Sequence, residues 1–276
     1  MCRWVGYFGS PLRVEELVYN TTHSLIEQSR SARQTSHLTN ADGFGLGWYG
    51  TSETPGVYHS VSPAWNDRNL QALAAQIESP LFLAHVRAST GTPVQQTNCH
   101  PFRWGRWLFV HNGFVRDYAL LRRDLLLGVD PRFFGAIEGT TDSELLFYLA
   151  LTFGLDDDAL PALERMTGFV EATARRFGIE DAVQMTLGVS EGERLYAVRY
   201  ASASEPNSLY VSNDARDVQL LHPDHERVQS FGEEDRAVVS EPLTELPGLW
   251  REVPASTAIV VQPGADEEVA FRPRPS

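Results

Sequence analysis

Cys2 is the residue of this sequence best suited to act as a nucleophile, because removal of Met1 would make it the N-terminal residue. Initiator methionine is normally removed when the second residue is small, as cysteine is. The mature chain would then carry a thiol and a free α-amine on one residue, and such an amine has a reference pKa of about 7.7–8.0. A partly neutral amine can act as the base for its own thiol nucleophile. The alternative is that Cys2 is only a small apolar residue at the start of a strand.

Arg87 is the second candidate, because it ends the apolar run LFLAHVR at 81–87. This position predicts a guanidinium in or near the core, where a buried charge needs a partner. The partner is either an Asp or Glu of the chain or the carboxylate of a substrate, which the planar guanidinium can bind through two parallel hydrogen bonds.

Asn112 and Gly113 follow the apolar run WLFVH at 107–111. Both residue types tolerate positive φ, so the pair fits an ordinary turn at the end of a strand. It also fits an oxyanion hole, in which the Asn112 side-chain amide and the Gly113 backbone N–H donate to a developing negative charge. The sequence leaves both interpretations open.

Asp142 lies in the segment GTTDSE at 139–144, directly before the apolar run LLFYLALTF. This pattern predicts the N-terminus of a helix, with Thr141 or Asp142 as the capping residue. The Asp142 carboxylate is also a candidate to hold a substrate ammonium group. The two roles are compatible.

Three histidines, His85, His100 and His111, raise the question of a metal site. Their spacing matches none of the compact zinc patterns, and only Cys99 lies nearby, so we predict neither a metal nor any other cofactor. A nucleophile–base pair of Cys99 and His100 is disfavoured, because neighbours on a strand point to opposite faces. Two cysteines make no disulfide framework, and a bridge between Cys2 and Cys99 is disfavoured.

The hydrophobic pattern predicts strands and helices in an order that suits one layered domain over residues 1–276. Strands are expected at 3–9, 43–50, 81–87, 107–111, 184–190, 194–200, 208–213, 236–240 and 257–262, and helices at 14–18, 66–78, 142–153 and 159–177. Ser10 and Pro11 suggest a turn, and Asn66 a helix cap. The glycines of 43–50 suggest close approach of another backbone. Strands before and after the helices favour an α+β fold on largely antiparallel sheets.

Composition and net charge argue against two kinds of partner, namely nucleic acid and membranes. The chain has 276 residues, enough for a substantial core, and a formal net charge of −13, which disfavours nucleic acid. No run approaches the roughly 18 apolar residues of a transmembrane helix, and the first residues lack a secretory pattern. We therefore expect a cytoplasmic protein that does not bind membranes.

Nine segments carry a family resemblance when they are taken together. They are MCRWVGYFG at 1–9, HSLIEQS at 23–29, DGFGLGWY at 42–49, PAW at 63–65, AHVRAST at 84–90, NCHPF at 98–102, WLFVHNG at 107–113, GTTDSE at 139–144 and VVSEPL at 238–243. In this order the set resembles the class II glutamine amidotransferases, which are N-terminal nucleophile hydrolases. It is most similar to the stand-alone bacterial branch, which has a glutaminase domain and no fused synthase.

The resemblance implies a fold and a set of catalytic roles. The family fold is a four-layer αββα sandwich, with two stacked antiparallel sheets between helical layers. Cys2 matches the nucleophile, with its α-amine as base, and Asn112 and Gly113 match the oxyanion hole.

The resemblance also implies how glutamine would be bound. Arg87 matches the residue that binds its α-carboxylate, and Asp142 the acceptor of its α-ammonium group, while Thr90 and His100 lie in segments that line the pocket. Synthase-fused members carry Arg-Trp-Ala-Thr where this chain has RAST at 87–90, which implies a different pocket wall.

Three functions remain open at this stage. The first is a glutaminase or amidotransferase that passes ammonia to an enzyme partner or releases it. The second is a hydrolase of a larger γ-glutamyl amide, similar to the γ-glutamyl hercynylcysteine S-oxide hydrolase, which shares the MCR start and the HNG segment. The third is a non-catalytic protein that binds glutamine.

Overall fold

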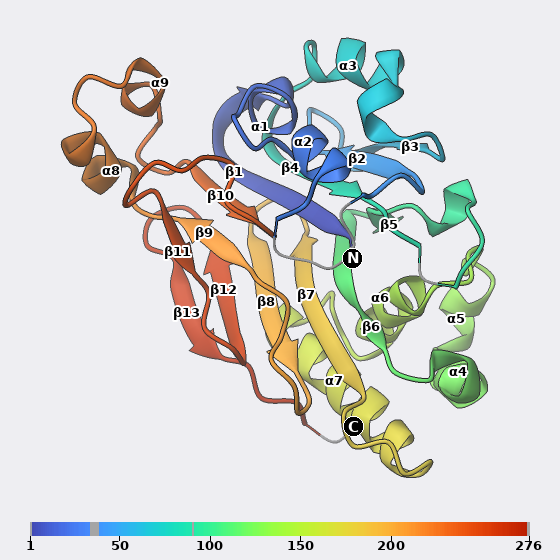
Figure 1. Cartoon of the computed structure of the whole chain (residues 1–276). Helices are drawn as coiled ribbons and strands as arrows, with labels where there is room; N and C mark the ends of the chain where they lie inside the picture. The colour runs from blue at the N-terminus through green and yellow to red at the C-terminus, as the bar shows by residue number, and fades with distance from the viewer. Residues whose placement is uncertain (1, 34–38, 90, 275–276) are drawn as a thin grey trace.

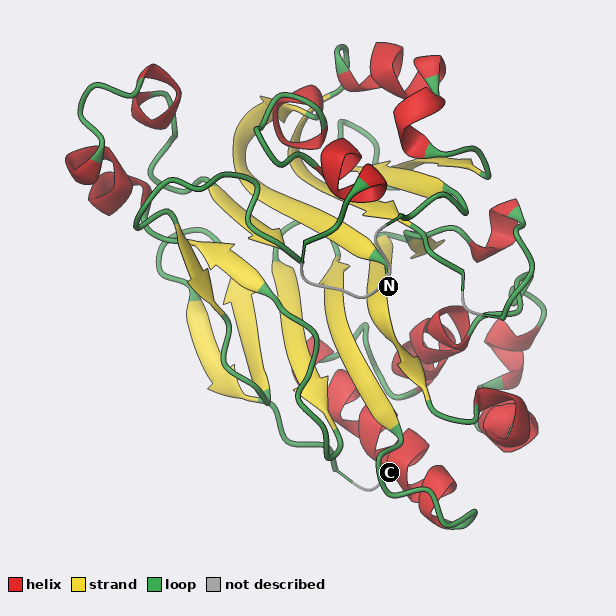
Figure 2. Cartoon of the chain, in the orientation of Figure 1, coloured by secondary structure: helices red, strands yellow, loops and turns green. Residues whose placement is uncertain are grey.

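Two antiparallel β-sheets face each other, and helices cover the outer face of each sheet (Figure 1, Figure 2). The computed structural model describes residues 2–33, 39–89 and 91–274. This arrangement is the four-layer αββα sandwich, so the expected α+β fold class is confirmed. None of the helices in these ranges is long and apolar enough to cross a bilayer.

The larger sheet holds the start of the chain at its centre. Its strands in the described residues are, in spatial order, β11 (Trp250–Glu252), β9 (Tyr210–Ser212), β10 (Arg236–Val239), β1 (Arg3–Arg13), β4 (Glu78–Val86), β2 (Phe44–Trp48) and β3 (Gly56–Ser60). Strand β1 therefore pairs with β10 on one side and with β4 on the other.

The smaller sheet carries the second half of the predicted site. Its strands run in the order β13 (Glu267–Ala270), β12 (Thr257–Val261), β8 (Leu195–Ala201), β7 (Val183–Ser190), β6 (Trp107–Val115) and β5 (Phe102–Trp104). Strand β6 pairs with β7 from Leu108 to Val115, whereas β5 covers only its first residues. Beyond Phe109, no strand of the described residues pairs with the other edge of β6.

Helices form the two outer layers. The larger sheet is covered by α1 (Glu15–Val18), α2 (Leu25–Arg30) and α3 (Arg68–Ala74), and the smaller by α4 (Tyr118–Leu126), α5 (Pro131–Phe134), α6 (Asp142–Thr152) and α7 (Ala159–Arg175). Two short helices, α8 (Ala215–Leu221) and α9 (Glu226–Gln229), stand beside β9, β10 and β11 (Figure 1). Two 3-10 turns span Ala64–Asn66 and Gln96–Asn98.

Burial on both faces explains why the predicted strands read as almost continuous apolar runs. Along β1, Val5 and Tyr7 pack toward the helices, while Trp4 and Phe8 pack between the sheets. Successive side chains of a strand point to opposite faces, so both sets must be apolar when both faces are covered.

Two local predictions are wrong. Ser10 and Pro11 do not turn the chain, because β1 continues to Arg13 through an irregular register between Phe8 and Leu12. The helix predicted at 66–78 is the shorter α3, and its cap is Asp67, whose carboxylate accepts from the Leu70 N–H, instead of Asn66. From Glu78 onward the chain pairs with β1, which ends the helical pattern.

The glycines of 43–50 do mark a close backbone approach. A Cβ on Gly45 would lie 2.0 Å from the carbonyl oxygen of His100. Only glycine leaves room there for the segment that carries Cys99 and His100 to cross β2.

Candidate active site

Cys2 lies one residue before β1, beside the end of β4. Its thiol is partly buried and receives a hydrogen bond from the Ala88 backbone N–H, with the two atoms 3.5 Å apart. Burial raises the pKa of this thiol above its ordinary value, while the Ala88 amide and the positive charges of Arg87 and Arg3 act in the opposite direction. A neutral thiol of this kind needs a base before it can attack.

Arg87 follows directly after β4 and is only 3% exposed. Its guanidinium donates to the Asp42 carbonyl oxygen at 3.3 Å, the Ser89 hydroxyl at 3.3 Å and the Thr92 hydroxyl at 2.6 Å. All three acceptors are neutral, and within the described residues no carboxylate pairs with Arg87. The internal carboxylate partner considered from the sequence is therefore not found among the described residues, where the buried guanidinium beside the Cys2 thiol forms no ion pair.

Asn112 and Gly113 lie inside β6 and do not form a turn, because β6 continues to pair with β7 as far as Val115. The side chain of Asn112 is 1% exposed, and its Oδ1 atom is buried with no hydrogen-bond partner. A Cβ on Gly113 would lie 1.9 Å from the Gln184 carbonyl oxygen, so the close strand pairing requires glycine. Buried polar atoms without partners are rare in folded proteins and point to a functional site.

Asp142 is the first residue of α6, and Thr141 is the cap, since its hydroxyl accepts from the Glu144 N–H. One carboxylate oxygen of Asp142 accepts from the Val115 N–H at 2.8 Å. The other accepts from the N–H of Ser143 at 2.7 Å and from its hydroxyl at 3.2 Å. The Asp142 carboxylate stays half-exposed beside β6.

The three histidines cluster next to these groups. The rings of His85 and His100 lie 4.1 Å apart, and both nitrogens of His100 are buried without a partner. Burial lowers the pKa of His85 to about 3, and that of His100 well below its ordinary value, so both rings are neutral. His111 accepts or donates a 2.8 Å hydrogen bond between its Nδ1 and the Ser143 hydroxyl.

No group of three or more His, Cys, Asp or Glu side chains in the described ranges is arranged to hold a metal ion. Cys2 and Cys99 are both free thiols, so the disfavoured bridge between them is absent.

Contacts between the sheets bring the predicted residues to one place. The Trp4 indole of β1 donates to the Thr186 hydroxyl at 3.1 Å, and that hydroxyl contacts the Asn112 carbonyl oxygen at 3.5 Å. His85 of β4 contacts the His111 carbonyl oxygen at 3.2 Å. The strands next to Cys2 and Arg87 and the strand that carries Asn112 are thus joined at the interface of the two sheets. Thr90, predicted to line the pocket, lies outside the described residues, as does Met1.

Two residues with clear structural roles at the site, Asn98 and Glu241, were assigned no role from the sequence. Asn98 is fully buried and bonds to both the N–H and the hydroxyl of Thr140, which anchors the segment before Asp142. Glu241 is a buried carboxylate that pairs with Arg3. The available signal for Glu241 was a charged residue among apolar ones in VVSEPL, whereas the polar stretch around Asn98 carried no comparable signal.

A large cavity lies elsewhere. It has a volume of about 1000 Å³ and is lined by residues of α1, α8 and α9 on the outer side of the larger sheet. Its lining includes Arg13, Val218 and Trp250 and none of the predicted site residues, so it is not the chemical site proposed from the sequence.

Comparison with known proteins identifies the family. Residues 17–275 match the family described as glutamine amidotransferases class-II. The chain belongs to the class II glutamine amidotransferases. The matched range begins after Cys2. A relative that aligns with 95% of the chain is the probable glutamine amidotransferase DUG3 of Saccharomyces cerevisiae. The two sequences are 30% identical over 294 residues, which cover 82% of DUG3.

Further relatives agree with this family and are enzymes. The gamma-glutamyl-hercynylcysteine sulfoxide hydrolase of Mycolicibacterium smegmatis is 34% identical over 177 residues, which cover 63% of this chain and 72% of the relative. A glutamine aminotransferase class-II domain protein from Silicibacter pomeroyi has a similar structure, with a TM-score of 0.75, 31% identity, and coverage of 99% of this chain and 100% of that one.

A more distant structure supports the fold alone. The glutamine phosphoribosylpyrophosphate amidotransferase of B. subtilis superposes with a TM-score of 0.65 at 14% identity, over 99% of this chain and 50% of that one. The chain thus shares the N-terminal nucleophile hydrolase fold and spans half of that larger protein.

Proposed function

We propose that this protein cleaves the γ-amide of glutamine or of another γ-glutamyl compound through a thioester on Cys2, after Met1 is removed. The observation that carries the proposal is Arg87, a buried guanidinium beside the Cys2 thiol that has no carboxylate partner in the described part of the chain. A buried cation without a counterion is costly, and a substrate carboxylate would supply the missing charge.

Arg87 and Asp142 together would hold the amino-acid end of the substrate. Arg87 would bind the α-carboxylate. The Asp142 carboxylate would accept from the α-ammonium group, since each carboxylate oxygen has room for more than the hydrogen bonds it already accepts. Two fixed charges at one end of the substrate orient the γ-carbonyl and remove much of the entropic barrier to attack. Thr90 and His100 would line the same pocket.

The oxyanion would form at β6. The Val115 N–H donates to Asp142 at the edge of β6 away from β7. Residues two apart on a strand direct their N–H groups to the same edge, which supports a free donor on Gly113. The second donor would be the Nδ2 group of the buried Asn112 side chain. Donors of this kind stabilise the negative charge as it develops on the carbonyl oxygen.

The reaction would then follow in two halves. The α-amine of Cys2 takes the thiol proton as the sulfur bonds to the carbonyl carbon of the γ-amide, and the negative charge passes to the carbonyl oxygen. The C–N bond breaks, the leaving nitrogen takes the proton from the α-ammonium group, and a γ-glutamyl thioester remains. Water attacks the thioester, with the α-amine again as base, and releases glutamate and the free thiol.

The leaving group separates two versions of the proposal. With glutamine, ammonia is released or passed to an acceptor enzyme as partner. With a larger γ-glutamyl amide, an amine leaves, a version supported by the relative that is a gamma-glutamyl-hercynylcysteine sulfoxide hydrolase. In either version we propose a single domain over residues 1–276 that acts in the cytoplasm, where a reducing environment keeps the Cys2 thiol free.

The first test is the intact mass of the purified protein before and after incubation with 6-diazo-5-oxo-norleucine, an electrophile that mimics glutamine. We expect a starting mass without methionine and one covalent adduct, which is lost in Cys2→Ala. Retained Met1, or a free Cys2 that forms no adduct, would contradict a nucleophile in a glutamine-shaped pocket.

A second test addresses the leaving group. Release of glutamate is measured from glutamine and from γ-glutamyl amides with larger amine portions, at equal enzyme concentration. Faster turnover of glutamine supports the amidotransferase version, and faster turnover of the larger amides supports the hydrolase version. Cys2→Ala is the control for both.

A further inference from the structure

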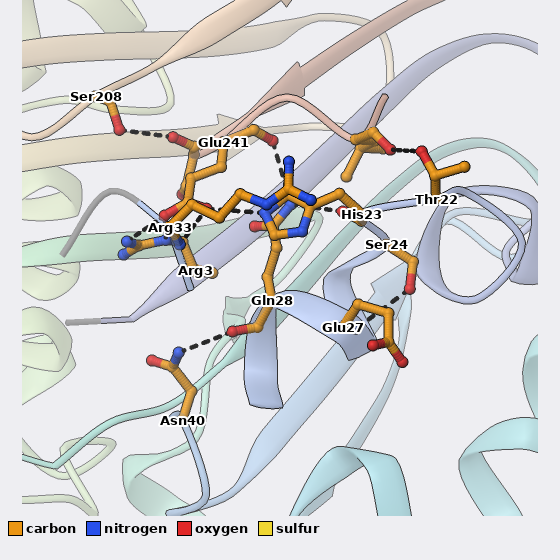
Figure 3. A network of polar contacts seen from close by, with 12 residues as sticks. Arg3, Thr22, His23, Ser24, Glu27, Gln28, Arg33, Asn40, Ser208 and Glu241 are labelled. Carbon is orange, nitrogen blue, oxygen red and sulfur yellow. Dashed lines mark hydrogen bonds and ion pairs between the residues drawn. The ribbon is translucent and has the colours of Figure 1, made fainter. Parts of the chain in front are cut away.

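A buried ion-pair network connects the start of β1 to the segment that follows β10. Arg3 is 2% exposed and Glu241 is 1% exposed. The Nε of Arg3 donates to Oε1 of Glu241 at 2.7 Å, and the Oε2 atom of the same carboxylate contacts His23 Nε2 and accepts from the Arg33 backbone N–H, each at 3.0 Å (Figure 3). Glu241 thus joins the N-terminal strand to the chain on both sides of α2.

The same network holds the backbone of the nucleophile. Nη1 of Arg3 donates to the carbonyl oxygen of Cys2 at 2.7 Å. The next residue, Trp4, is bound by Ser240, whose hydroxyl accepts from the Trp4 N–H at 3.0 Å and whose N–H donates to the Trp4 carbonyl oxygen at 3.1 Å. Residues 2–4 are therefore held in succession by the pair Ser240 and Glu241.

Cys2 needs such an anchor because the sheet does not hold it. The register of β1 begins at Arg3 on the β4 side and at Val5 on the β10 side. Chain ends fray unless other contacts hold them, and an N-terminal residue has a single peptide bond to fix it. A catalytic nucleophile must stay within about 0.5 Å of its productive position, so the Arg3 contact with the Cys2 carbonyl is a means of holding it.

We propose that Glu241 is a positioning residue for the nucleophile. Through Arg3 it fixes the peptide carbonyl of Cys2, and hence the direction of the thiol and the α-amine. The inference rests on the proposed function in one respect, which is that Cys2 is the nucleophile. It goes beyond that function because Glu241 acts through Arg3, 238 residues away in sequence, and takes no part in the bond changes.

A purely structural role is the competing explanation, and the chain offers a matched control for it. Arg236 pairs with Asp266 at 3.1 Å, and these side chains are 8% and 15% exposed. This pair joins β10 to the turn before β13 and does not contact Cys2. Loss of either carboxylate leaves a buried arginine without part of its counter-charge, so Asp266→Asn controls for stability alone.

The test compares Glu241→Gln, Asp266→Asn and wild type in three measurements on the full chain. These are the rate of labelling by 6-diazo-5-oxo-norleucine, the affinity for L-glutamate by calorimetry, and the alkylation rates of Cys2 and Cys99 by iodoacetamide, separated by peptide mass spectrometry. In Glu241→Gln we expect labelling to fall about 100-fold, which is the cost of a displacement near 1 Å. Glutamate affinity should be unchanged, because Arg87 and Asp142 are untouched.

The alkylation rates distinguish a local displacement of Cys2 from a general destabilisation of the fold. In Glu241→Gln, Cys2 should react faster with iodoacetamide, since it is no longer held against Ala88, while buried Cys99 should react at the wild-type rate. Asp266→Asn should match wild type in all three measurements. Normal labelling in Glu241→Gln, parallel loss of labelling and glutamate affinity, or equal acceleration of both cysteines would overturn the proposal.

A double variant covers the case in which Glu241→Gln does not fold. Arg3→Met with Glu241→Gln removes both charges, and replacing a whole buried pair is far better tolerated than breaking it. We expect it to recover thermal stability without recovering labelling. Recovery of both would show that the pair is only structural. If wild type itself is not labelled, the proposed function fails, and the alkylation of Cys2 against Cys99 still decides the positioning role.

Discussion

Replacement of Arg87 by methionine is expected to weaken substrate binding without weakening the fold. The guanidinium donates three hydrogen bonds to neutral acceptors, each worth about 0.5–1.5 kcal/mol of net stability. Against this loss stands the relief of a buried, unpaired cation, whose effective cost is several kcal/mol. The free energy of unfolding of Arg87→Met should therefore stay within about 1 kcal/mol of wild type or rise, which corresponds to a change in Tm of at most about 4 °C downward.

Binding should respond in the opposite way. Removing one partner of a desolvated charge pair typically costs about 2–5 kcal/mol. The Kd for L-glutamate, measured by calorimetry, is thus expected to rise roughly 30-fold to 5000-fold. A variant that binds substrate poorly and is as stable as wild type, or more so, is the pattern of a residue that is kept for function.

Arg3→Met provides the contrast for the stability measurement. Arg3 is as deeply buried as Arg87, but it pairs with Glu241, which would be left as a buried charge without this partner. Breaking such a pair costs about 3–5 kcal/mol, so thermal denaturation should separate the two variants clearly. Loss of about 3 kcal/mol or more in Arg87→Met, together with unchanged glutamate affinity, would refute the assignment of Arg87 to substrate.

Three further predictions concern the amide, the glycine and the buried histidines. Asn112→Ala should lower kcat about 100- to 1000-fold in a glutamate-release assay and leave the Kd for glutamate unchanged, because the donor acts on the oxyanion; an equal loss of both would indicate a role in binding. Gly113→Ala should lower Tm and activity together, since its Cβ would lie 1.9 Å from the Gln184 carbonyl oxygen; a wild-type Tm would contradict this. The pKa of His85 is about 3 when folded and near 6.5 when unfolded, so the unfolded state binds more protons between these values. The free energy of unfolding should then fall as the pH drops from about 6.5 toward 3, by up to about 1.4 kcal/mol per pH unit, and His85→Gln should flatten that slope in denaturant titrations.

The strands could be predicted from the local hydrophobic pattern, because both faces of the central strands are covered by other elements of the fold. Runs such as those containing Leu83 and Val110 are apolar at almost every residue, which is a signal that a short window of sequence contains. The cap of α6 is equally local, since Thr141 and Glu144 are one helical turn apart. Where a competing local signal existed, as at Ser10 and Pro11, the chain stayed extended because β1 resumes its pairing with β4 at Leu12 and Arg13.

The sequence by itself determined the candidate residues, because their types and order carry the chemistry: Cys2 at the second position, an arginine at a strand end, and Asn112 with Gly113 after an apolar run. Only the tertiary structure decided whether Arg87 has an internal counterion, since that depends on every acidic residue that folding could bring near it.

The same limit applies to the two remaining features of the site. Asn112 and Gly113 became part of a strand instead of a turn because β7, more than 70 residues away, continues to pair with β6. Arg3 and Glu241 are 238 residues apart, and no local pattern reports their contact. Periodicity and turn chemistry act over a few residues, whereas the partner of a buried charge is set by how the strands of the sheet are ordered.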